Sequence, residues 1–109
     1  MDTVKTTVYN ALSSLTGVTV QKANTAIGQN LPVLAYRVSQ NAPRYDFDKT
    51  IGLQDVEITI DIFAAGSTST ILAAAEAKMR EIDYFLTYTA DLPDPEGLEH
   101  TNARFTANI

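Results

Sequence analysis

The chain contains no cysteine and no tryptophan. Without cysteine there can be no disulfide bridge, no thiolate metal ligand and no cysteine nucleophile, so packing alone must stabilise the fold. Aromatic residues make up only 8% of the chain, so the core must consist mainly of isoleucine, valine, leucine and alanine. There is a single histidine, His100, and no serine triad can be built without it.

Long apolar runs and basic charge are scarce as well. No stretch approaches the roughly 18 apolar residues that a membrane helix needs, and residues 1–5 lack the basic start of a signal peptide. Lys and Arg number 8 against 13 Asp and Glu, which gives a formal net charge of −5. The basic residues are dispersed, which disfavours a nucleic-acid-binding module. Mild acidity suits instead a surface past which DNA moves without binding.

The size and composition of the chain are those of one globular domain. Its 109 residues, 45% apolar and 19% charged, are enough for a modest core and too apolar for a disordered segment. We therefore predict a single domain over residues 1–109.

The clearest pattern lies in residues 55–64, where the even-numbered positions are apolar and the odd-numbered ones, apart from Phe63, are polar. A period of two predicts a strand with one buried and one exposed face. Residues 71–86 follow with an apolar stripe at helical spacing. Because this helix follows the strand directly, we expect it to cover the apolar face. The stripe consists of Leu72, Ala75, Met79, Ile82 and Leu86.

Periodicity also predicts elements along the rest of the chain. Apolar residues at helical spacing indicate a helix over residues 3–15. Alternation indicates strands over residues 18–22 and 31–39 and a final strand over residues 100–109.

The remaining segments carry turn residues or mixed patterns. Residues 40–43 are interpreted as a turn, residues 44–54 as an excursion that forms a β-arm, and residues 87–97 as a loop. The predicted order is α-β-β-(β)-β-α-β. This order predicts an α+β fold, with two helices packed on one face of a mainly antiparallel four- to five-stranded sheet and a β-arm around residues 40–54.

No motif in the sequence predicts a catalytic, cofactor-binding or metal site. Asp55, Glu57 and Asp61 project from one side of the predicted strand, and carboxylate clusters can hold Mg²⁺ or Ca²⁺. The same spacing arises whenever the exposed face of a strand carries charge, so a solvated or partner-facing surface is favoured. His100, on the polar side of the last strand, is interpreted as a solvated or interface residue. A small metal-dependent enzyme that uses the three carboxylates stays open as an alternative.

Three aromatic residues are predicted to lie at exposed positions. Tyr45 and Phe47 share one side of the excursion, and Phe63 projects toward the polar side of its strand. Exposed aromatics at edges favour burial against another chain, and the alternative is that the arm folds back onto its own domain. The chain has too few large residues to seal both sides of so long a sheet, which favours an oligomer. We predict Tyr45, Phe47 and Phe63 as subunit or partner interface residues.

Four segments together resemble a known family. They are residues 12–18 at the end of the first helix, the strands at 31–38 and 56–64, and the helix at 71–86. Leu-Pro at the start of a strand, and an apolar strand that ends in an aromatic before an alanine-rich helix, are typical of that family. In these respects the chain resembles the small tail-completion or tail-terminator proteins of long-tailed bacteriophages, also called head–tail joining proteins.

The resemblance implies a non-enzymatic virion structural protein without cofactors. Such proteins form a homohexameric ring that caps the tail tube and joins it to the head connector or adaptor protein. DNA passes through the ring's channel without specific binding, and no membrane is involved. The protein would be located in the tail or neck of the virion and assembled in the host cytoplasm. A head-completion adaptor or a small minor tail protein is the alternative within the same class.

Overall fold

Two helices and five strands form the part of the chain that the structure describes, which comprises residues 2–23, 31–45, 51–93 and 97–108. The structure is a computed structural model. All five strands belong to one sheet with the order β1-β2-β3-β5-β4. β1 and β2 are parallel and every other pair is antiparallel, so the sheet is mixed. In chain order the elements are α1 (Asp2–Leu12), β1 (Thr19–Lys22), β2 (Val33–Tyr45), β3 (Ile51–Ala64), α2 (Ser69–Glu81), β4 (Phe85–Leu92) and β5 (Glu99–Asn108).

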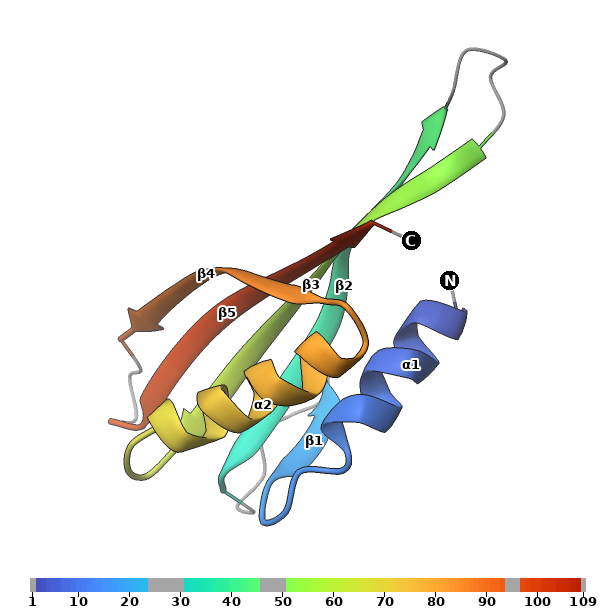
Figure 1. The fold of residues 1–109 in the computed structure, drawn as a ribbon. Helices are drawn as coiled ribbons and strands as arrows, with labels where there is room; N and C mark the ends of the chain where they lie inside the picture. The colour runs from blue at the N-terminus through green and yellow to red at the C-terminus, as the bar shows by residue number, and fades with distance from the viewer. Residues whose placement is uncertain (1, 24–30, 46–50, 94–96, 109) are drawn as a thin grey trace.

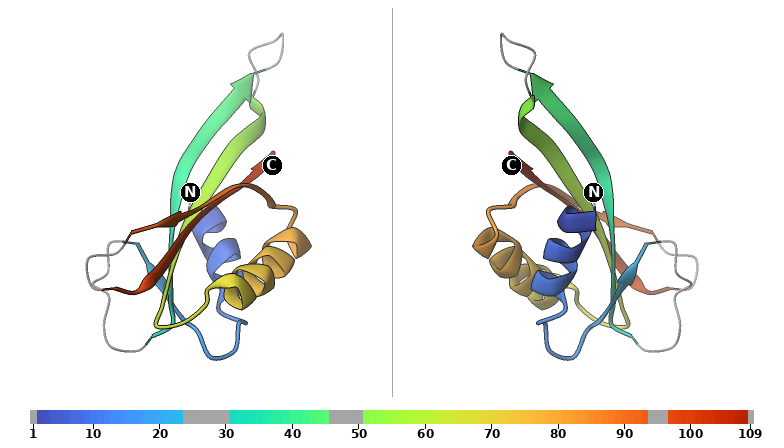
Figure 2. Two further views of the ribbon diagram at one scale, coloured as in Figure 1. Left: turned by 90° about the vertical axis from the view of Figure 1, so that its left-hand side faces the viewer. Right: turned by 90° about the vertical axis from the view of Figure 1, so that its right-hand side faces the viewer.

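Both helices lie on the same face of the sheet, as Figures 1 and 2 show. The main core lies between the helices and this face, and it joins buried side chains of α1 and α2 to those of β2, β3 and β5. The predicted α+β class is therefore confirmed. Within the residues described, neither helix is long and apolar enough to cross a membrane.

The alternation predicted for β3 places its even-numbered side chains against the helices. Val56, Ile58, Ile60, Ile62 and Ala64 are all buried. The strand register continues this face onto β5, where the partners of the first four are buried as well. Those β5 partners are Ala107, Phe105, Ala103 and Thr101.

α1 turns one apolar side toward the sheet, because Val4, Val8 and Leu12 recur at helical spacing and are buried. The helix ends at Leu12, three residues before the predicted end. The hydroxyls of Ser13 and Ser14 donate hydrogen bonds to backbone carbonyls of the last turn, at 3.3 and 2.7 Å. Serine side chains that compete in this way for backbone groups favour helix ends over helix interiors.

α2 ends at Glu81, so the prediction that this helix continues to residue 86 is wrong. Asp83 adopts a left-handed conformation with φ of 64°. The amide of Tyr84 donates to the carbonyl of Met79, and the amide of Asp83 donates to that of Arg80. This pair of bonds is a Schellman C-terminal motif, and the buried Met79 and Tyr84 supply the apolar contact that accompanies it.

The early end of α2 frees the following residues to form a strand that the sequence analysis did not predict. β4 occupies residues 85–92, so the loop predicted over 87–97 is wrong for its first half. β4 pairs with β5 alone and is therefore one edge of the sheet. The observed order of elements is thus α-β-β-β-α-β-β.

β2 is longer than predicted, and the turn expected at residues 40–43 is wrong because these residues pair with β3. Val38 pairs with Ile58 but Gln40 pairs with Glu57, so Ser39 is an extra residue in β2. Such a β-bulge bends a strand without ending it. The β2–β3 pairing continues as far as Tyr45, whereas β3 pairs with β5 only from Asp55 onward.

Burial of the Tyr84 hydroxyl makes stability sensitive to alkaline pH. Burial raises the pKa of Tyr84 above its ordinary value of 10.0. The unfolded chain therefore loses this proton first, so the stabilisation is complete below about pH 10 and is lost as pH rises through the raised pKa. We expect urea unfolding between pH 8 and pH 11 to show a smaller alkaline loss in Tyr84→Phe than in the wild type. Parallel losses would contradict the burial of this hydroxyl.

Candidate interaction surface

The sheet face turned away from the helices, called here the open face, collects most of the polar side chains of the central strands. It is built from the odd-numbered residues of β3 and the even-numbered residues of β5, which the register places beside one another. Neither helix covers this face in Figure 2. On β3 and β5 the open face comprises Asp55, Glu57, Thr59, Asp61, Phe63, His100, Asn102, Arg104 and Thr106.

A hydrogen-bonded cluster occupies one end of the open face. Asp61 Oδ1 accepts a hydrogen bond of 2.9 Å from Asn102 Nδ2 and lies 2.8 Å from His100 Nε2. The His100 ring also stacks on Phe63, with ring centroids 4.2 Å apart. The side chains of His100 and Asp61 are only 15% and 23% exposed. The cluster therefore fixes the imidazole between a carboxylate and an aromatic ring.

An aspartate beside a histidine is two-thirds of a hydrolytic triad, so the third group decides the interpretation. In the described part of the chain, no hydroxyl makes a hydrogen bond to His100. Among the hydroxyls of the open face, Ser39 donates to Glu57 Oε1 at 2.7 Å and accepts from Thr59 at 2.8 Å. The contacts of His100 thus orient a ring on the surface and supply no nucleophile.

The three carboxylates considered for a metal site lie on the open face, and two of them bond to separate partners. Asp61 bonds to His100 and Asn102, and Glu57 bonds to Ser39. Over the ranges that the structure describes, no three His, Cys, Asp or Glu side chains gather in a group that could hold a metal ion.

The Asp61 cluster gives a stability prediction. We expect Asp61→Ala to lower the free energy of unfolding by about 1–2 kcal/mol, because Asn102 and His100 would lose their shared acceptor. Glu81→Ala is the matched control, since this carboxylate is 66% exposed and 3.8 Å from Lys78, and we expect a change within about 0.5 kcal/mol. Urea denaturation measures both, and equal losses would contradict a structural role for the cluster.

The edge strand β4 exposes a row of large apolar side chains, called here the β4 patch. It consists of Phe85, Tyr88 and Leu92, which are 52%, 47% and 41% exposed. The Arg104 guanidinium lies 4.8 Å from the Tyr88 ring centroid, in cation–π geometry. An edge strand with free backbone groups and exposed apolar side chains is a typical site of association with another chain.

The structure separates the three predicted interface residues. Phe63 lies on the open face, in one row of the register with His100 and Leu92. Tyr45 lies near the opposite end of the β2–β3 pair, opposite Ile51. Phe47 lies outside the described residues. Phe63 therefore belongs with the β4 patch, which the sequence analysis missed, and not with Tyr45.

A signal for the β4 patch was present in the sequence. Tyr88, Ala90 and Leu92 alternate with Thr87, Thr89 and Asp91, which is the period of a strand. The helical spacing of Ile82 and Leu86 concealed the start of this strand.

Comparisons with known proteins assign no function to the chain, so its function must be inferred from these surfaces. No protein-family model matches the chain, and no curated protein is significantly similar to its sequence. The surfaces to be explained are the open face, the β4 patch and the part of the β2–β3 pair that extends past β5.

Proposed function

We propose that this chain is a non-enzymatic structural protein that assembles into a ring, as do the tail-terminator proteins that its sequence resembles. The ring would contain copies of this chain alone, as a homohexamer. It would cap the tail tube of a long-tailed phage and join it to the head connector, with DNA passing through its channel. The protein would then reside in the tail or neck of the virion.

The observation that carries the proposal is the extension of the β2–β3 pair beyond the sheet. We call residues 43–54 the arm, of which 43–45 and 51–54 are described. In the described part of the arm, β2 and β3 pair only with each other, because the described residues of β5 pair with β3 no farther than Asp55. Figure 1 shows this part of the pair pointing away from the helices and the sheet.

A two-stranded ribbon without a covered face is at best marginally stable in water. The arm is therefore better explained as a part that packs on a neighbouring subunit than as a free projection. The β4 patch supports the same proposal, because it leaves apolar area uncovered on the isolated chain. Tyr45 and Phe47 in the arm, and Phe63 on the open face, remain the proposed contact residues.

The proposal is tested by assembly. We expect native mass spectrometry and light scattering at high protein concentration to detect six-copy rings, or electron microscopy to detect the protein capping the ends of purified tail tubes. A protein that stays monomeric and also ignores tail tubes would contradict the proposal. Location at another layer of the virion would favour the head-completion adaptor or minor tail protein instead.

A further inference from the structure

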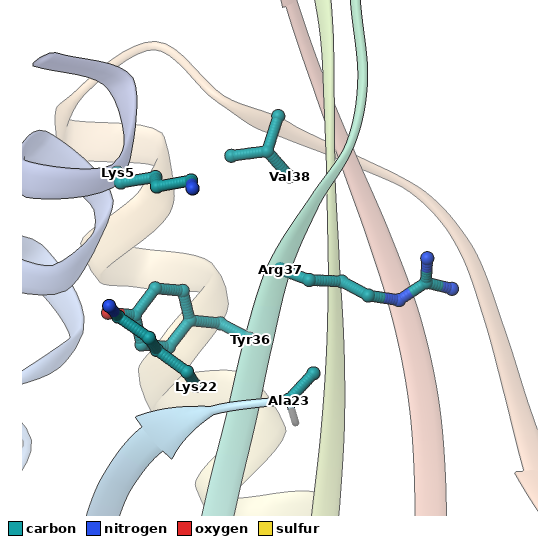
Figure 3. Close-up of a pocket in the computed structure, with 6 residues that line it drawn as sticks. All are labelled: Lys5, Lys22, Ala23, Tyr36, Arg37 and Val38. Atoms are coloured by element: carbon teal, nitrogen blue, oxygen red, sulfur yellow. The ribbon is translucent and has the colours of Figure 1, made fainter. Parts of the chain in front are cut away.

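A basic hollow lies at the β1 edge of the molecule, between α1 and the sheet. It has a volume of about 330 Å³ and is lined by residues of α1, β1 and β2. In Figure 3, Lys5 of α1, Lys22 of β1 and Tyr36 of β2 reach into the same space, whereas Arg37 points away from it. The hollow thus brings two ammonium groups and a phenol together at one edge of an acidic protein.

The two lysines of this hollow have no carboxylate partner among the described side chains. The other lysine and arginine of the helical layer do, since Lys78 lies 3.8 Å from Glu81 and Arg80 lies 2.7 Å from Glu76. Burial, and to a smaller extent the neighbouring Tyr9, raises the pKa of Tyr36, so its hydroxyl stays protonated and can donate a hydrogen bond. The hollow therefore offers donors and positive charge to an anionic group.

An acidic hollow lies at the opposite edge of the same sheet. It has a volume of about 590 Å³ and is lined by the carboxylates Asp91 and Glu99 and by hydroxyl side chains near the start of α2. Asp91 Oδ1 accepts a hydrogen bond of 2.9 Å from Thr101. Neither carboxylate has an ion-pair partner in the described ranges.

The register of the sheet places the two hollows at nearly the same level. Lys22 of β1 pairs with Tyr36, and the same row continues across the sheet through Ile60 and Ala103. It ends at Thr89 of β4. Asp91 is two positions farther along β4, a distance of about 7 Å along a strand. Lys22 and Asp91 also lie on the same sheet face, the one that the helices cover, because their paired neighbours Tyr36 and Thr101 belong to that face.

We propose that these two edges bind each other in successive copies of the chain, with Asp91 and Glu99 of one copy facing Lys5 and Lys22 of the next. Opposite charges at one level of opposite edges suit a head-to-tail contact, and such a contact forms a ring when the rotation between successive copies closes. The β4 patch lies on the same edge strand as Asp91 but projects to the open face, so it offers apolar area beside the charged contact. The inference rests on the proposed ring and names the surfaces that join its subunits.

Zero-length cross-linking tests the contact directly. A carbodiimide joins lysine to a carboxylate only when the two already touch. In an equal mixture of ¹⁵N-labelled and unlabelled protein, we expect cross-links from Lys5 or Lys22 to Asp91 or Glu99 between peptides of different isotope content. The inference would be overturned if these links joined only peptides of the same isotope content. It would also be overturned if the cross-links joined other residues only.

Charge exchange tests the contribution of the contact to assembly. We expect Lys5→Glu with Lys22→Glu to weaken assembly at least about tenfold, and Asp91→Lys with Glu99→Lys to do the same. All four substitutions in one chain should restore assembly. Lys78→Glu with Arg80→Glu changes the net charge as much as the first pair and should have little effect. Should loss of the Asp91–Thr101 bond unfold the chain, Glu99→Lys alone replaces the second pair, since the Glu99 carboxylate makes no hydrogen bond to a described residue.

The outcomes separate this inference from the proposed function. If the wild type forms rings or caps tubes and the exchanged variants assemble equally well, the edge contact is wrong and the ring proposal stands. If the wild type neither forms rings nor caps tubes, both fail.

Discussion

Replacing Phe105 with alanine is expected to lower the free energy of unfolding by about 3–5 kcal/mol. Phe105 is completely buried on β5, where it pairs with Ile58 on one side and Leu86 on the other. The truncation removes apolar contacts with the helices and leaves a cavity that the stiff sheet cannot close. Since domains of this size are stable by only about 5–15 kcal/mol, the variant should lose a large part of its stability.

The control for this prediction is one strand away. Phe85 on β4 pairs with Thr106, on the open face, and is 52% exposed. We expect Phe85→Ala to change the free energy of unfolding by about 0.5 kcal/mol, as for other surface substitutions. Urea denaturation followed by circular dichroism measures both variants. A similar loss for the two would contradict the assignment of the helix-covered face as the core.

The elements that could be predicted from the sequence are those whose periodicity is uninterrupted. β3 and β5 alternate over most of their length, so their buried faces follow from the pattern. In α1, Val4, Val8 and Leu12 recur at helical spacing and are buried. In these segments the local sequence pattern and the tertiary packing favour the same structure.

The errors arise where one pattern continues by coincidence across a boundary. Ile82 and Leu86 extend the helical stripe of α2, but Asp83 in a left-handed conformation ends the helix. Glycine is the usual residue at this position, and an aspartate gives no such signal. In β2, Pro43 suggested a turn. Proline lacks an amide hydrogen, but a strand tolerates it at a bulge or an edge, where that hydrogen would have no partner.

The candidate surface depended on register, which single-strand patterns do not contain. Alternation within each strand predicts Asp61, Phe63 and His100 on outward faces but contains no information on whether the three meet. Pairing of β3 with β5 brings Phe63 beside His100 and Asp61 beside Asn102. The β4 patch was missed because the strand that carries it was not predicted.

Removal of the arm is expected to abolish assembly and to leave the monomer folded. Ala42 and Asp55 are paired directly, so an Asn-Gly turn between them can replace residues 43–54. The described part of the arm pairs only within itself, so its loss removes no ladder of the remaining sheet. We expect the free energy of unfolding to change by less than about 1 kcal/mol, because an isolated ribbon contributes little stability.

The finer variant tests the aromatic residues alone. If Tyr45 and Phe47 pack on a neighbouring subunit as hot spots, Tyr45→Ala with Phe47→Ala should weaken assembly by at least about 100-fold, since a hot-spot aromatic costs about 2 kcal/mol or more when truncated. Tyr45→Phe with Phe47→Leu keeps the apolar area and should assemble nearly as well as the wild type. Sedimentation measures assembly and urea denaturation measures the fold. A double alanine variant that unfolds would place these rings in the core of the monomer, and one that still assembles would remove the arm from the interface.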